Sequence, residues 1–155
     1  MAATGVTGGG GPGRGPDIDA SIRGLVDALN AFDGIETIGS CGGHPEPLSP
    51  GQFPEDEWFV RFRVEHSENG WHALEFLAWL INNDYVRGGH NVMLYPTASP
   101  PYLNRPGKVL SFALEGRRGE DADALAAWIN QLRVENYVSP ADLEADQDVS
   151  IDDVQ

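Results

Sequence analysis

A thiol and an imidazole stand three residues apart in one glycine-containing segment of this 155-residue chain. Cys41 and His44 flank Gly42 and Gly43, and Ser40 precedes them. Two consecutive glycines permit positive φ angles and a close approach of the backbone to a ligand. The plainest interpretation is a Gly/Pro turn with a small buried cysteine and an exposed histidine. The functional interpretation is a ligand-binding loop made of these five residues.

Three kinds of chemistry are open to such a loop. Cysteine and histidine are zinc ligands, and His66 and His90 could complete a set of four with Cys41 and His44, although a second closely spaced pair is missing from the sequence. The thiol could instead be a nucleophile, held as thiolate by His44 or His66, with the two glycine amides forming an oxyanion site. A phosphate cradle is the third possibility, but the segment around Gly42 and Gly43 lacks the longer glycine pattern that marks such loops.

Arg61 and Arg63 are the best candidates for gripping an anionic ligand, because guanidinium groups bind phosphate and carboxylate in a fork. They alternate with apolar residues along one segment and share its polar face with Glu65. A cross-strand salt network is therefore the simpler expectation for both arginines.

Hydrophobic spacing predicts the elements that must position these residues. We expect an α+β fold of order αββαββα, a mostly antiparallel four-stranded sheet with helices packed on one face. Asp17 or Asp19 is expected to cap the first helix and Ser67 the second. The period of two places His66 on the inward face with Trp58. The predicted segments are a helix from 17 or 19 that Asp33-Gly34 ends, strands 35–40 and 57–66, a helix 67–81, strands 91–95 and 108–115, and a helix 121–137.

The length predicts one domain with loose ends. We expect a flexible Gly-rich N-terminus at 1–16, a single domain at 17–138 and an acidic, disordered tail at 139–155. The four tryptophans stand at periodic positions, which predicts a place in the core.

The net charge is −14, from 10 basic and 24 acidic residues. Direct nucleic-acid binding is disfavoured because it draws on Lys and Arg that neutralise phosphates. The expected partner is a small molecule or a basic protein. One cysteine favours a reducing compartment, and no apolar run approaches a membrane span, so a cytoplasmic protein without membrane contact is expected.

Two segments resemble a known family. The run IETIGSCGGHPEP, followed after a loop by EWFVRFRVEHSENGWHALEFLAWL, is similar to the small tRNA methyltransferases of wybutosine synthesis. Ser40, Cys41 and Gly43 match that family's Ser-Cys-Ser-Gly-Arg signature, His66 matches its later histidine, and His44 stands where the family has Arg.

The resemblance implies a ligand-binding domain with S-adenosylmethionine as cofactor and methyl transfer to a modified guanosine in tRNA. The site that follows from it is the Ser40–His44 loop together with His66. By themselves the residues assign no cofactor, and zinc is less favoured by their spacing. The rival hypothesis is a non-enzymatic acidic protein that binds or inhibits a basic partner.

Overall fold

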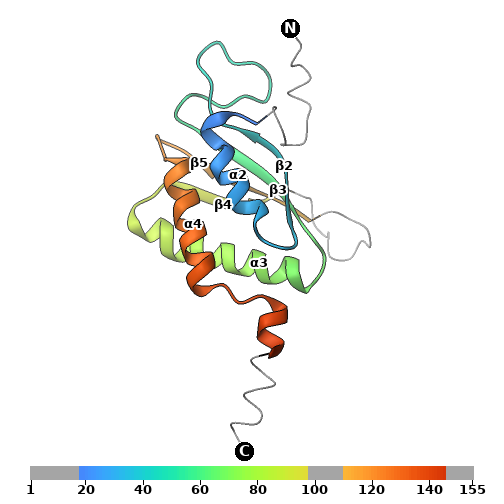
Figure 1. Cartoon of the computed structure of the whole chain (residues 1–155). Coiled ribbons are helices and arrows are strands. Elements are labelled where there is room, and N and C mark those ends of the chain that lie inside the picture. The colour runs from blue at the N-terminus through green and yellow to red at the C-terminus, as the bar shows by residue number, and fades with distance from the viewer. Residues whose placement is uncertain (1–17, 98–109, 146–155) are drawn as a thin grey trace, which may run out of the picture.

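Four antiparallel strands form one sheet in the order β2-β3-β5-β4, in a computed structural model that describes residues 18–97 and 110–145. Figure 1 shows the α-helices gathered on one side of this sheet. The predicted α+β fold is therefore confirmed. Its elements are the 3-10 turn η2 (Ala20–Ile22), α2 (Arg23–Asn30), β2 (Ile35–Cys41), β3 (Trp58–Val64), α3 (Glu68–Trp79), the π-helical η3 (Leu80–Tyr85), the 3-10 turn η4 (Val86–Gly88), β4 (Val92–Pro96), β5 (Leu110–Gly116) and α4 (Ala122–Asn136).

The central strand β3 carries the core on one face only. Its buried positions alternate with Phe59, Arg61 and Arg63, so every second side chain points toward the helices. Phe62 lies at the centre and is fully buried, with Leu25 of α2 and Ile129 of α4 in the same cluster. The inward residues of β3 are Trp58, Val60, Phe62 and Val64.

Side-chain caps fix where two helices begin. The Ser67 hydroxyl accepts a hydrogen bond from the Gly70 amide, as predicted for α3. The Asp121 carboxylate accepts hydrogen bonds from the amides of Asp123 and Ala124 at the start of α4. Both caps satisfy backbone donors that the first helical turn leaves without partners.

The tryptophans divide between core and surface, which corrects the expectation that all four are buried. Trp58 is 4% exposed, and its indole N–H donates to the Glu120 carbonyl at 2.8 Å. Trp71 and Trp79 are exposed at 37% and 44%. They stand on α3, whose buried line runs through Ala73 and Leu77, so helical spacing alone placed the two large rings on the wrong face.

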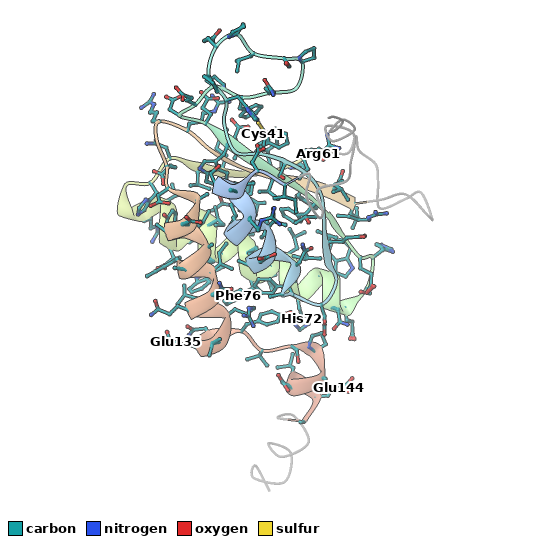
Figure 2. The ribbon with its side chains drawn as sticks, turned by 45° about the horizontal axis from the view of Figure 1, so that its top comes forward. Cys41, Arg61, His72, Phe76, Glu135 and Glu144 are labelled. Carbon is teal, nitrogen blue, oxygen red and sulfur yellow. The ribbon has the colours of Figure 1, made fainter. Side chains whose placement is uncertain are left out.

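The acidic segment after α4 begins with a helical turn rather than with the disorder expected from its composition. Residues 140–145 are helical, and the Ser139 hydroxyl accepts from the Asp142 amide at 3.1 Å. Leu143 lines a hollow of about 510 Å³ with Phe76 and Trp79 of α3. Figure 2 shows Phe76 and Glu144 at the end of the molecule away from Cys41. The predicted flexible segment 1–16 and the remainder of the acidic tail, 146–155, lie outside the described residues.

No helix in the described ranges combines the length and the apolar character that a membrane crossing requires.

Candidate functional site

A β-bulge decides which face of the sheet Cys41 occupies. Ile35 and Thr37 pair with Val64 and Phe62 on the inward face, but the register shifts between Thr37 and Gly39. An extra residue in one strand reverses the alternation beyond it. Cys41 consequently pairs with Phe59 on the face opposite the helices.

The loop after β2 folds back over Cys41. The His44 amide donates to the Phe53 carbonyl at 2.8 Å, and the Phe53 ring lies 4.7 Å from that of Phe59. The Phe53 amide in turn donates to Cys41 Sγ at 3.4 Å. Cys41 is therefore only 4% exposed although it lies on the open face of the sheet.

Gly43 allows this return because its φ is +96°. A Cβ at this position would lie within 3.0 Å of the backbone carbonyl oxygens of Pro54, Glu55 and Glu57. The position thus requires glycine both for its φ and for the close approach of two backbone segments.

Asp19 brings a carboxylate to the same loop from before the first helix. It occupies the N-cap position of η2, but its side chain caps nothing there. Its Oδ2 accepts instead from the Gly42 amide at 2.8 Å and lies 3.2 Å from His44 Nε2. The Arg23 guanidinium donates to the Ile18 carbonyl at 3.0 Å, which helps to position the backbone just before Asp19.

The carboxylate, the thiol and the imidazole converge. Ligand atoms of Asp19, Cys41 and His44 all lie within 4.8 Å of one another. Two oxygen or nitrogen ligands of a tetrahedral zinc ion at about 2.0–2.1 Å from the metal are separated by about 3.3 Å. The 3.2 Å between Asp19 Oδ2 and His44 Nε2 fits that separation.

The burial of Cys41 separates two chemistries that the sequence left open. A nucleophilic thiolate must be reached by its substrate, whereas a metal ligand can be covered by protein on every side except that of the ion. Cys41 is covered by the 44–57 loop, while the side chains of His44 and Asp19 are 30% and 35% exposed. This arrangement suits metal ligation better than nucleophilic attack.

An acidic pocket of about 250 Å³ adjoins the cluster through Gly42 and Ser21. The Ser21 hydroxyl donates to the Gly42 carbonyl at 3.4 Å, so the pocket and the loop share this contact. Five acidic residues line the pocket: Glu55, Asp56, Glu120, Asp121 and Asp123. Walls of one sign of charge concentrate counter-ions, and these walls attract cations.

The other predicted histidine ligands lie elsewhere. Cys41 pairs with Phe59 at the start of β3, and His66 follows the end of that strand, on the order of 20 Å away. His66 is exposed and meets the Trp71 ring edge-on at 5.6 Å, which corrects its predicted inward position, because the strand ends at Val64. His90 stacks on Tyr85 at 3.8 Å and lies 3.2 Å from Glu120. The predicted set of Cys41, His44, His66 and His90 is therefore not brought together.

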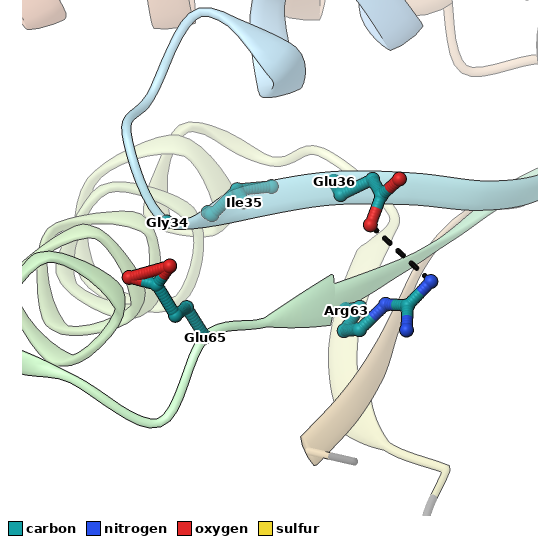
Figure 3. Close-up of a pocket in the computed structure, with 5 residues that line it drawn as sticks. All are labelled: Gly34, Ile35, Glu36, Arg63 and Glu65. Carbon is teal, nitrogen blue, oxygen red and sulfur yellow. Dashed lines mark ion pairs between the residues drawn. The ribbon is translucent and has the colours of Figure 1, made fainter.

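The predicted arginine pair lies on the open face of the sheet. Arg63 forms an ion pair of 3.2 Å with Glu36 on β2, as Figure 3 shows beside Gly34 and Glu65. This is the cross-strand contact expected for that face. Arg61 pairs in register with Gly39 and Ala113, and the described residues offer its side chain no ion pair. Among the described residues, neither guanidinium forms an ion pair with Asp19.

Cys41 and His44 belong to this cluster, Ser40 precedes it, and Gly42 and Gly43 shape its loop, so five of the eight predicted site residues lie in or beside it. Asp19 is the participant that sequence reasoning missed. Its pattern, an acidic residue before an apolar helix, signals a cap, and no local signal connects it with a loop beyond the next strand.

Comparisons of the chain with protein-family models, with curated proteins and with solved structures found no match.

Proposed function

We propose that this chain binds a divalent transition-metal ion, zinc foremost, through Asp19, Cys41 and His44. The observation that carries the proposal is the convergence of three different zinc-ligating groups within 4.8 Å. A thiolate and an imidazole favour zinc over magnesium or calcium, which prefer sets of oxygen ligands.

Contacts around the three ligands support the same proposal. The Phe53 amide donates to the sulfur and the Gly42 amide donates to the carboxylate. Such outer contacts orient ligands and offset their charge, and their loss commonly weakens metal binding by about 10- to 100-fold. The neighbouring carboxylate-lined pocket raises the local concentration of cations.

Three protein ligands leave one position of a tetrahedral zinc ion for water or a substrate. The acidic pocket beside Gly42 gives a small cation or a basic side chain room next to that position. In this proposal, the ligand of the predicted binding segment at residues 40–44 is a metal ion. S-adenosylmethionine binding and a basic protein partner stay predictions. The loop and His66 lie too far apart to form one binding site for S-adenosylmethionine.

Cobalt(II) titration of the chelator-treated protein tests the proposal. Cobalt replaces zinc in such sites, and a thiolate ligand gives it an intense charge-transfer band in the near ultraviolet. We expect this band in the unaltered chain, and we expect zinc to displace it. Cys41→Ser should abolish the band, and His44→Gln should weaken cobalt binding by at least about 10-fold.

His66→Gln is the matched control, because it removes an imidazole at the far end of β3. It should leave the titration unchanged. A folded, unaltered protein that gives no thiolate band would refute the metal site. Equal cobalt affinity in the His44→Gln and His66→Gln variants would refute the assignment of its ligands.

A further inference from the structure

Another pocket lies beside the edge strand β4 and the start of the turn between β5 and α4. Its volume is about 330 Å³. Its polar wall consists of His90, Asn91, Arg117 and Arg118. Two of the chain's 10 basic residues and a histidine line this one hollow, and the carboxylates that accompany them, Glu115 and Glu120, are not among its lining residues.

The histidine is held in a fixed orientation. Its ring stacks on Tyr85 with a centroid distance of 3.8 Å and an interplanar angle of 17°. Its Nδ1 lies 3.2 Å from Glu120 Oε1, and the Asn91 amide donates to the other oxygen of that carboxylate at 2.7 Å. Because Nδ1 is engaged with the Glu120 carboxylate, Nε2 is the ring nitrogen that faces a ligand, and it donates to an oxyanion when the ring carries both protons.

Arg117 is anchored at one nitrogen. Its Nε donates to Glu115, a carboxylate only 3% exposed that also accepts from the Tyr95 hydroxyl at 2.7 Å. A guanidinium group has five N–H donors in a fixed fork, so this single bond leaves the terminal nitrogens for a ligand. The Arg117 side chain is 53% exposed, which keeps those nitrogens accessible.

Arg118 adopts a backbone conformation that is costly for any residue with a Cβ. Its φ is +59°, and among the described residues other than glycine it is the one with a positive φ. Gly119 follows with a φ of +76°. Residues with strained backbone angles cluster at ligand sites, where the strained conformation positions a side chain for binding. Here the strained turn places a second guanidinium next to Arg117, and the described residues provide it with no carboxylate.

Arg117 is already paired with Glu115, whereas the described residues give Arg118 no carboxylate, so an oxyanion in the hollow would offset the second guanidinium charge. We propose that this pocket binds a small oxyanion, the carboxylate or phosphate group of a ligand, through Arg117, Arg118 and His90. Both oxyanions match the fork of a guanidinium. Val86, Val92 and the exposed Met93 form the apolar part of the wall, so the ligand carries an apolar portion beside its charged group.

NMR titration of the full-length, nitrogen-labelled chain with inorganic phosphate and with acetate tests this site, at constant ionic strength set with chloride. We expect saturable shifts of the amides of Asn91, Arg117 and Gly119 with at least one of the two anions. The anion with the lower Kd identifies the class of ligand head group.

Arg118→Gly removes the guanidinium and suits the positive φ, so the variant should fold at least as well as the unaltered chain. It should weaken anion binding by 10-fold or more. Arg87→Gln is the matched control, because it removes the same charge from η4 at a residue that does not line the pocket. Its affinity should be unchanged. Shifts that fail to saturate with both anions, or equal weakening in the two variants, would overturn the proposal.

Discussion

His44 Nε2 lies 3.2 Å from Asp19 Oδ2, although a helix and a strand separate the two residues in the chain. Asp19 stands at the start of the first helical turn, and His44 stands in the loop after the edge strand β2. The Gly42 amide joins them by donating to the same carboxylate oxygen at 2.8 Å. This contact fixes the start of the loop that follows Cys41, and the metal proposal depends on it.

Asp19→Asn should weaken zinc binding by at least about 10-fold while leaving the fold intact. The amide oxygen of asparagine can still accept from Gly42, so the change removes the charge of the ligand and keeps its shape. Competition with a zinc-binding dye measures the affinity. Asp27→Asn, on the exposed face of α2, removes the same charge away from the site. Equal affinities in the two variants would show that Asp19 is not a ligand.

Zinc should protect the Cys41 thiol from modification by a disulfide reagent. The thiol is 4% exposed, so reaction requires the 44–57 loop to open. If opening also requires release of the metal, zinc at 100 times its Kd should slow the reaction by about 100-fold. The absorbance of the thiolate released from Ellman's reagent gives the rate of Cys41 modification. Magnesium at the same concentration should have no effect, and protection by both ions alike would count against thiolate ligation.

Gly43→Ala should destabilise the protein by about 3 kcal/mol or more. A φ of +96° is unfavourable for any residue with a Cβ. The added Cβ would also clash with three backbone carbonyl oxygens. Gly51→Ala is the control in the same loop, because its φ is +84° and no other atom lies within 4 Å of the added carbon. It should cost roughly 1–2 kcal/mol from the left-handed φ alone. Midpoints of urea unfolding compare the two, and equal losses would contradict the crowding.

Stability should fall as the pH rises from 10 to about 12. Burial and the hydrogen bond to Glu115 raise the pKa of Tyr95 from 10.0 to about 12. The unfolded chain loses this proton first, so the stabilisation is complete below pH 10 and is lost as the pH rises through the folded pKa.

Ultraviolet absorbance of tyrosinate follows the titration, and Tyr95→Phe should remove the step near pH 12. The same variant should flatten the alkaline loss of stability. A step near pH 12 that persists in Tyr95→Phe would assign it to another tyrosine.

Local patterns were enough to predict the three α-helices and four strands of the domain. The alternation along β3, the Ser67 cap and the apolar line of α4 depend on neighbours in sequence, and the structure confirms them. Surface and core on α3 were harder to separate, because Trp71 and Trp79 are as apolar as the residues that are buried there. Leu143, which lies beside Trp79, belongs to an acidic segment whose composition gave no sign of order.

By itself the sequence determined the α+β class, the order of the elements and the glycine-containing loop after the first strand, because period, caps and glycines act over a few residues. Only the tertiary structure decided which groups meet at that loop. The bulge between Thr37 and Gly39 turned Cys41 away from the helices, and the pairing of β2 with β3 placed His66 at the far end. Asp19 entered the site through a contact with Gly42 that no local pattern encodes. Strand register and loop closure are set by the packing of the whole chain, so these parts of the site could not be predicted from residue spacing.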